Sequence, residues 1–232
     1  MKKIILLYAL LAAATTSVQA QRDTLTFDNE YYHSRRAFSE ITPVTKSDIV
    51  MLGNSLTERG LWSEYFRGIR VMNRGIGGDC ISGMINRLPS ILQGKPKAVF
   101  IMGGINDLLF SKISYEKLLK QYERLLDIIA SESPHTKIYI QSLLPVNESY
   151  NEKMFGGQNE RIIRYNVLLR EMAGRRGFTF IDIWSDMQQN GELPAERTVD
   201  GIHLSGAGYI VGLKLFDGIL IMYNSLYLGL IA

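Results

Sequence analysis

The stretch IVMLGNSLT, residues 49–57, decides the fold that this sequence predicts. Its apolar run Ile49–Leu52 is typical of a buried β-strand, and Gly53 ends that run. Residues 56–62 can begin a helix, so Ser55 is expected at a strand-to-helix turn beside free backbone N–H groups. That position suits a nucleophile, because a helix N-terminus helps to hold a developing oxyanion. It equally suits an ordinary helix N-cap, the commoner role of serine at such a place.

Strands and helices alternate along the rest of the chain. Apolar runs predict four more strands, at 69–72, 98–102, 137–144 and 178–183. Helical spacing of apolar residues predicts helices at 81–92, 115–130 and 161–173, and a final helix after Ser205. Short strands separated by helices favour one parallel sheet with helices on both faces. In such sheets, functional sites collect beyond the carboxyl ends of the strands.

Two further segments complete the expected organisation. Before the first strand, Tyr31, Tyr32, Phe38 and Ile41 are predicted to form one packed side of a short helix. Residues 147–158 are polar and contain glycine, so they predict a loop near the end of the fourth strand.

The first twenty residues have the layout of a secretory signal peptide. Lys2 and Lys3 precede an apolar run at 4–14, and Val18-Gln19-Ala20 offers small residues for cleavage. The run is short for a bilayer span, which argues against a retained anchor. We therefore expect export to the periplasm or the extracellular space, with residues 21–232 as one mature domain.

The composition is that of a globular domain with a full core. The chain of 232 residues is 46% hydrophobic and 21% charged, which argues against disorder. Its formal charge is +3, or +1 once the two lysines of the signal peptide are removed, and no basic cluster suggests a nucleic-acid partner. Cys80 is the only cysteine, so no internal disulfide can form, and a buried apolar role is expected for it.

Histidine is scarce enough to narrow the choice of a general base for Ser55. The chain has only His33, His135 and His203. His33 lies in a polar N-terminal segment and His135 in a turn before the fourth strand, so both are expected to be solvated. His203 follows Asp200 by three residues in a loop before the last helix, a spacing that lets the carboxylate hold the second ring nitrogen. Alone, this pair would be read as a turn aspartate with an unrelated histidine.

Two glycine-bearing loops offer hydrogen-bond donors to the same rim. The loop at 73–79 could cradle a phosphate, but it matches neither the dinucleotide nor the P-loop spacing. Alternatively, its glycines let a backbone N–H point at an oxyanion. In the loop at 103–107, Asn106 could donate from its side-chain amide or merely cap the turn.

Four segments then stand in one order: Gly53-Asn54-Ser55-Leu56, Asn73 to Gly78, Gly104-Ile105-Asn106-Asp107 and Asp200-Gly201-Ile202-His203. Together they resemble the four sequence blocks of the SGNH hydrolases, also called GDSL-type esterases, over roughly residues 48–210. Each block is weak alone, but four in order are highly specific.

The resemblance implies a flavodoxin-like three-layer α/β/α sandwich around a central five-stranded parallel sheet. It implies Ser55 as nucleophile, His203 as base and Asp200 as the residue that orients His203. It also implies an oxyanion hole made of the Ser55 and Gly78 backbone N–H groups and the Asn106 side chain. No metal or organic cofactor is implied.

The sequence departs from the family pattern in two places. Asparagine stands at position 54, where the family motif has an aspartate that is not a member of the triad. The chain after Gly208 is unusually apolar, and Ile219–Ala232 is short for a membrane span. We therefore expect a buried helix followed by an apolar tail, with no stable membrane span in the mature chain.

The expected reaction is hydrolysis of a short-chain acyl ester through an acyl-enzyme. An O-acetyl ester on a carbohydrate ranks first as substrate. A lysophospholipid, a platelet-activating-factor-like lipid or an acyl thioester is the alternative. Tyr150, Phe155 and the pair Gly156-Gly157 are expected to form a wall over the site. A catalytically silent binding protein on the same fold is the alternative from a different class.

Overall fold

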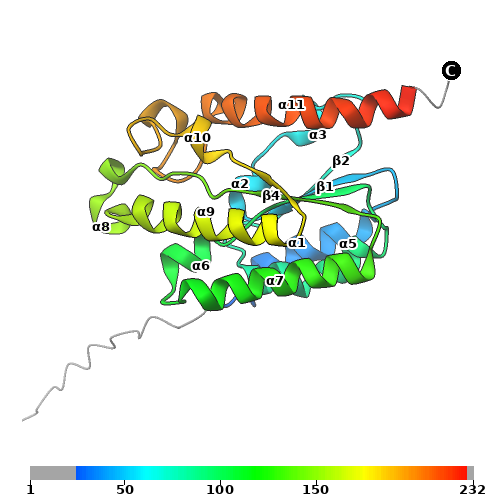
Figure 1. Ribbon diagram of the computed structural model, residues 1–232, viewed down its shortest axis with the longest axis horizontal. Helices are drawn as coiled ribbons and strands as arrows, with labels where there is room; N and C mark the ends of the chain where they lie inside the picture. The colour runs from blue at the N-terminus through cyan, green and yellow to red at the C-terminus, as the bar shows by residue number, and fades with distance from the viewer. Residues whose placement is uncertain (1–24, 229–232) are drawn as a thin grey trace, which may run out of the picture.

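The protein is a three-layer sandwich with one parallel sheet at its centre. A computed structural model describes residues 25–228, with helices above and below the sheet (Figure 1). The strands are β1 (Ile49–Gly53), β2 (Val71–Gly75), β3 (Ala98–Met102), β4 (Lys137–Gln141) and β5 (Thr179–Ile181). They lie in the order β2-β1-β3-β4-β5, and every pairing is parallel. This is the flavodoxin-like order, so the predicted fold is confirmed.

The helices divide between the two faces of the sheet. One layer holds α1 (Glu30–Ile41), α4 (Ile81–Asn86), α5 (Leu88–Leu92), α6 (Ile105–Phe110), α7 (Tyr115–Glu132) and α9 (Gln158–Arg175). The other holds α2 (Ser55–Glu58), α3 (Trp62–Tyr65), α10 (Trp184–Met187) and α11 (Gly206–Leu228). The short elements η1 (Glu148–Tyr150), α8 (Glu152–Phe155) and η2 (Ala195–Arg197) lie in the loops beyond β4 and β5.

Alternating side chains of the central strands supply two separate cores. On β1, Val50 and Leu52 face the layer of α7 and α9, whereas Ile49 and Met51 face the layer of α3 and α11. All five residues of β1, and likewise of β3, are buried. A strand covered on both faces gains from apolar residues at every position, which is why the run at 49–52 is continuous rather than alternating.

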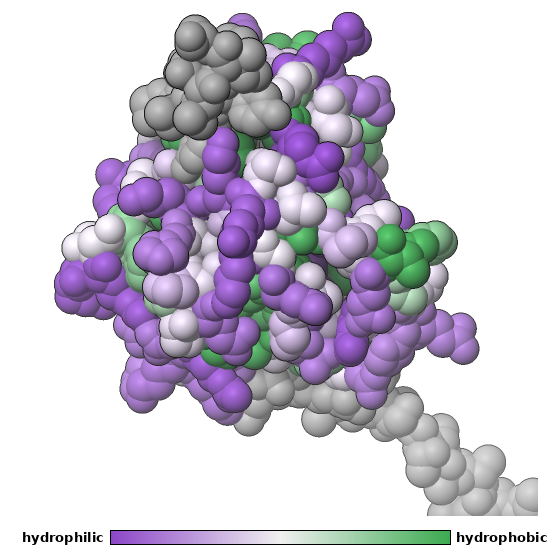
Figure 2. Space-filling model, turned by 90° about the vertical axis from the view of Figure 1, so that its right-hand side faces the viewer, coloured by the Kyte–Doolittle hydropathy of each residue, from purple (hydrophilic) through white to green (hydrophobic). Residues whose placement is uncertain are grey.

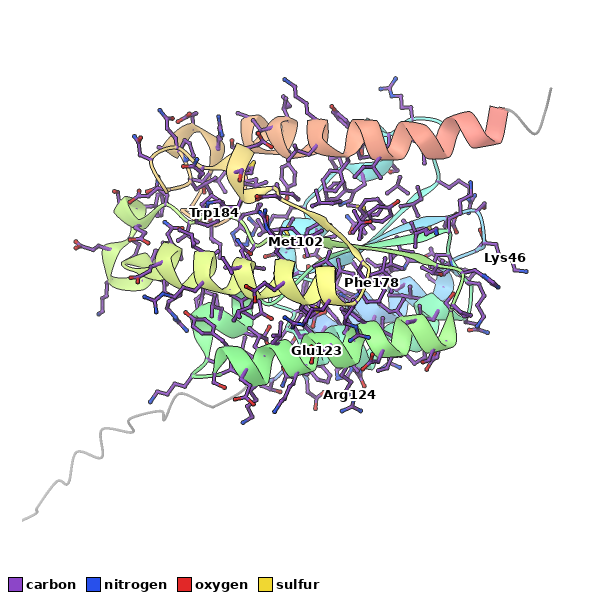
Figure 3. The ribbon with its side chains drawn as sticks, in the orientation of Figure 1. Lys46, Met102, Glu123, Arg124, Phe178 and Trp184 are labelled. Carbon is purple, nitrogen blue, oxygen red and sulfur yellow. The ribbon has the colours of Figure 1, made fainter. Side chains whose placement is uncertain are left out.

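The parallel strands place their carboxyl ends on one side of the molecule. Figure 3 shows this polarity, since Phe178, just before β5, lies toward the same end as Lys46, whereas Trp184, just after β5, lies toward the other. Figure 2 looks at the amino-end face, where hydrophilic residues cover much of the surface. Candidate site residues therefore belong to the opposite end, on the left of Figure 1.

Two predicted elements differ from those observed. The predicted helix at 81–92 is two helices, α4 and α5, separated at Arg87. Pro89 explains the break, because it has no N–H to donate to the carbonyl of Ile85 and its ring clashes with a continuing helix. The predicted loop at 147–158 contains η1, α8 and the start of α9.

The observed ends of three strands differ from the predicted ends by a few residues. The predicted strand at 69–72 is instead Val71–Gly75, so it takes in the start of the glycine-bearing loop. The predicted strands at 137–144 and 178–183 are shorter, ending at Gln141 and Ile181.

The N-terminal helix packs through a single aromatic residue. In α1, Tyr32 is buried, but Tyr31, Phe38 and Ile41 are exposed, so the predicted four-residue packed side is wrong. The spacing of these residues does not follow one helical stripe. Cys80 is buried, as predicted.

At the C-terminus, α11 continues as a helix to Leu228, through part of the segment expected to be a tail. Among the described residues, no helix is both long and apolar enough to cross a bilayer. The predicted signal peptide, residues 1–20, and the last four residues of the predicted tail lie outside the described residues.

Candidate active site

Ser55 lies at the carboxyl end of β1, at the first position of α2. The preceding residue, Asn54, is the N-cap, and its side-chain oxygen accepts a hydrogen bond from the Leu56 N–H at 3.0 Å. Since Asn54 performs the capping, the N-cap role considered for Ser55 is wrong. The Ser55 hydroxyl instead points to His203.

Three side chains form a continuous hydrogen-bonded chain. The Ser55 Oγ lies 2.9 Å from His203 Nε2, and His203 Nδ1 lies 2.6 Å from Asp200 Oδ2. A carboxylate on Nδ1 favours the tautomer that carries its proton there, which leaves Nε2 to accept the serine proton. Ser55 and His203 are 148 residues apart in the chain, so this contact exists only in the folded molecule.

The surroundings of Asp200 keep it ionised. Partial burial by itself would raise the pKa of Asp200, but hydrogen bonds from the His203 backbone N–H and imidazole outweigh it and lower the pKa. The second carboxylate oxygen also accepts from the backbone N–H groups of His203, at 2.8 Å, and Ile202, at 3.2 Å. These bonds fix the carboxylate relative to the ring.

A tight loop holds Asp200 and His203 in register. The Thr198 hydroxyl donates to the His203 carbonyl at 2.8 Å and accepts from the Gly201 N–H at 2.9 Å. Gly201 has φ +91, a left-handed conformation that favours glycine. The carboxylate and the ring therefore meet although only two residues, Gly201 and Ile202, lie between Asp200 and His203.

Two loops bring further donors to the same rim. Gly78, with φ +73, follows β2, and Asn106 follows β3 as the second residue of α6. The Asn106 Nδ2 donates one hydrogen to the Asp79 carbonyl at 2.9 Å, which orients the amide and leaves its second hydrogen for another acceptor. Among the described residues, neither the Ser55 nor the Gly78 backbone N–H donates to a protein acceptor.

A buried ion pair beneath these loops joins three chain segments. Arg87 contacts Asp79 at 2.9 Å and also donates to the carbonyls of Arg74, at 2.7 Å, and Gly53, at 2.9 Å. Arg87 therefore ties the ends of β1 and β2 to the residue that follows Gly78. Burial raises the pKa of Asp79 to about 6, although Arg87 opposes that shift.

Sequence reasoning missed Glu58 and its partners at the site. The Glu58 carboxylate accepts from the Gly77 N–H at 3.0 Å and from the Tyr31 hydroxyl at 2.8 Å, and it pairs with Arg35 at 2.8 Å. A glutamate three residues after Ser55 reads as a helix-capping acid. Only the fold places it against the loop before Gly78.

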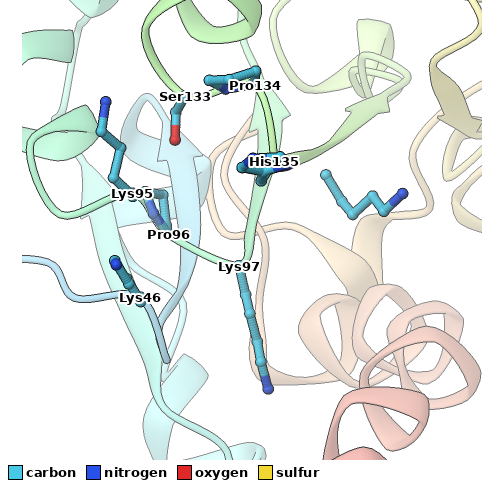
Figure 4. A pocket seen from close by; sticks show the side chains of 8 residues that line it. Lys46, Lys95, Pro96, Lys97, Ser133, Pro134 and His135 are labelled. Atoms are coloured by element: carbon cyan, nitrogen blue, oxygen red, sulfur yellow. The ribbon is translucent and has the colours of Figure 1, made fainter.

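The two other histidines lie away from Ser55. His33 pairs with Asp28 and is exposed, as predicted. His135 is exposed and lines a cavity of about 670 Å³ at the amino ends of the strands, together with Lys46, Lys95 and Lys97 (Figure 4). Of the three histidines, His203 is therefore the one that contacts Ser55.

The aromatic wall predicted over the site is only partly present. Tyr150 is exposed, but Phe155 is buried and packs against Gly201, where it belongs to the core. A small apolar cavity of about 20 Å³ lies against Leu56 and Leu204, and none of Ser55, Asp200 and His203 lines it. It is large enough for about one water molecule and is part of the core between the sheet and α11.

A family comparison agrees with this geometry. Residues 51–211 match the model of the GDSL-like lipase/acylhydrolase family, well over half of the chain. The chain belongs to this family. Members of the family hydrolyse esters, so the protein is an ester-hydrolysing enzyme, which argues against the alternative of a silent binding protein.

Individual relatives are distant but cover most of the enzyme. The platelet-activating factor acetylhydrolase IB subunit alpha2 of Rattus norvegicus is 25% identical over 170 residues, 70% of this chain and 71% of the rat protein. A structure described as a platelet activating factor from Streptococcus pneumonia is 28% identical, with a TM-score of 0.73, over 82% of this chain and 91% of its own. An acetyl xylan esterase shares the fold at 18% identity, with a TM-score of 0.61, over 74% of this chain and 99% of its own.

Proposed function

We propose that this enzyme is a serine esterase that removes short acyl groups, acetyl foremost, from carbohydrate esters. Ser55 is the nucleophile, His203 the general base and Asp200 the residue that orients His203. The backbone N–H groups of Ser55 and Gly78 and the side chain of Asn106 hold the oxyanion. The chain of hydrogen bonds from Ser55 through His203 to Asp200 is the observation that carries this proposal.

The reaction proceeds in two halves. His203 Nε2 takes the Ser55 proton while Oγ attacks the acyl carbonyl, and the tetrahedral oxyanion rests on the three donors. The alcohol leaves with the proton from His203, and the acyl group stays on Ser55. Water then gives its proton to His203 and attacks the acyl-enzyme, which releases the carboxylic acid and restores Ser55.

The names of two relatives support a small acyl group. The rat relative is named an acetylhydrolase and the acetyl xylan esterase is named for an acetyl ester, so acetate is the product common to both names. The rat relative's name also supports a second candidate, an acetylated lipid related to platelet-activating factor.

Residues 1–20 are proposed to be a signal peptide, which directs the mature domain, residues 21–232, to the periplasm or beyond. Mass spectrometry of the protein from the native cell should find a mature N-terminus at Gln21. An intact Met1 on protein from the cytosolic fraction would overturn the export proposal.

The role of Ser55 as nucleophile is tested with a probe that reacts covalently with a nucleophilic serine. Ser55→Ala should abolish labelling by a fluorophosphonate probe and lower acetate release to the background rate, because no other hydroxyl contacts His203 Nε2 among the described residues. Ser131→Ala, on the exposed surface of α7, is the matched control and should label normally. Labelling of Ser55→Ala at the native rate would remove Ser55 as the nucleophile.

A further inference from the structure

Helix α1 lies outside the residues that match the family, yet it packs against the site. Tyr32 anchors it, because its buried hydroxyl donates to the Gly83 carbonyl at 2.8 Å and its ring contacts Phe27, with centroids 4.9 Å apart. Gly83 belongs to α4, which follows the loop that carries Gly78. The anchor therefore fixes the position of Tyr31, the preceding residue.

Tyr31 is exposed and nevertheless held in one orientation. Half of its surface, 51%, is open to solvent. Its hydroxyl donates to Glu58, which also pairs with Arg35 and accepts the Gly77 N–H. An exposed aromatic ring fixed in this way loses little conformational entropy when a ligand covers it.

The ring lies close to Ser55 across Gly77. A Cβ placed on Gly77 would be 3.4 Å from Tyr31 Cε1 and 3.9 Å from Ser55 Cβ. The edge of the Tyr31 ring and the Ser55 side chain therefore both border the space beside Gly77, as does the Glu58 carboxylate at 3.0 Å from the same point. The missing side chain of Gly77 keeps that space open.

The chemistry around the ring is polar rather than apolar. Arg35 and Glu58 touch one another beside it, and the charge of Arg59 acts on the Tyr31 phenol. An acyl chain would gain nothing from such a rim. A sugar ring fits it, because its C–H face packs on an aromatic ring while its hydroxyls bond to charged groups at the edge.

We propose that Tyr31 contacts substrate by stacking on the saccharide ring that carries the ester, so that the site prefers acetylated sugars to simple alkyl acetates. This role rests on the esterase function proposed above. In this arrangement, the alcohol part of the ester substrate, the sugar, binds to a surface formed by α1.

The test compares acetylated glycosides with an acetate ester that has no sugar ring, in the native enzyme and three variants. Acetate release is measured with mono-O-acetylated methyl glycosides of hexoses and xylose and with ethyl acetate, which has no ring. In Tyr31→Ala, the ratio of kcat/KM for the best glycoside to kcat/KM for ethyl acetate should fall about tenfold, mainly through a higher KM for the glycoside. Tyr31→Phe, which keeps the ring and loses the bond to Glu58, should keep this ratio within about twofold of the native value.

Phe38→Ala serves as the matched control, because Phe38 is another exposed aromatic residue of α1, at 59% against 51% for Tyr31. Its ratio should also stay native. An unchanged ratio in Tyr31→Ala would overturn the stacking role. So would an equal loss in Tyr31→Phe and Tyr31→Ala, since the tyrosine would then act through Glu58 and not through its ring.

Failure of the esterase function itself has a different signature. Native enzyme that releases acetate from neither substrate would contradict the proposed function. Native enzyme that hydrolyses ethyl acetate but none of the glycosides would leave the serine esterase reaction standing, and it would contradict both the carbohydrate substrate and the role of Tyr31. Vesicles containing an acetylated phospholipid form a third arm, and a loss in Tyr31→Ala confined to that arm would also overturn the saccharide assignment.

Discussion

At the scale of single residues, the oxyanion role proposed for Asn106 uses one hydrogen of an amide whose other hydrogen is already bonded. One hydrogen is bonded to the Asp79 carbonyl, which orients the amide and leaves the second hydrogen for the oxyanion of the proposed reaction. A donor oriented before the substrate arrives costs no reorganisation during the reaction. The buried position of Asn106 strengthens the effect, because water competes poorly there.

Asn106→Ala should therefore lower kcat by about a hundred- to a thousandfold while KM for the acetyl ester changes little. Asn106→Asp keeps the shape but replaces the donors with oxygens, so it should lose at least as much. Steady-state kinetics of both variants check this, and thermal melting of each shows that the fold persists. A native kcat in a folded Asn106→Asp variant would remove this side chain from the oxyanion hole.

At the scale of elements, the close approach of α2 to β2 fixes the position of Ser55. A Cβ on Gly75, the last residue of β2, would lie 2.1 Å from the Glu58 backbone nitrogen and 2.5 Å from its Cα. Backbone atoms cannot yield as a side chain does. Glycine at position 75 therefore permits the packing that brings Ser55 and the loop of Gly78 to one rim.

Gly75→Ala should destabilise the enzyme by about 1–3 kcal/mol or more, because α2 must move away from β2. Activity should fall with it, since α2 carries Ser55. Gly174→Ala is the matched control, because nothing lies within 4 Å of the added methyl group in α9 and alanine favours a helix by about 0.5–1 kcal/mol. Urea unfolding of both variants decides the matter, and equal stability of the two would contradict the packing role of Gly75.

At the scale of the whole molecule, buried carboxyls make stability depend on pH. Burial raises the pKa of Asp107 to about 6, opposed by a hydrogen bond from the Ile81 N–H. In the unfolded chain the same group titrates near 3.8. The stability that it contributes is complete below about pH 4 and is lost as the pH rises through about 6.

Asp107→Asn removes this titration and keeps an oxygen for Ile81. The unfolding free energy of the native enzyme should fall, relative to that of Asp107→Asn, by up to about 3 kcal/mol between pH 4 and pH 7. Urea unfolding at several pH values measures the difference. The pKa of Asp79 is raised in the same direction, but Asp79 is present in both proteins. If the unfolding free energies of the two proteins changed in parallel with pH, Asp107 would not be the cause of the pH dependence.

The amino-acid sequence by itself determined the class of fold and the candidate residues for the catalytic triad. Continuous apolar runs predicted strands buried on both faces, and three histidines were few enough to single out His203 beside Asp200. These features are local, because the periodicity of apolar residues and the spacing of Asp200 and His203 can be seen within short stretches of sequence. The break between α4 and α5 at Arg87 also has a local cause, Pro89. It was not predicted, because the apolar residues of 81–92 keep a helical spacing across it.

Only the tertiary structure decided which residues surround Ser55. It gave the capping role to Asn54, placed Arg87 under two strand ends, and brought Glu58 and Tyr31 to the loop before Gly78. These contacts join segments far apart in the chain. Their partners are chosen by the packing of helices on the sheet, and no pattern along the sequence encodes that choice.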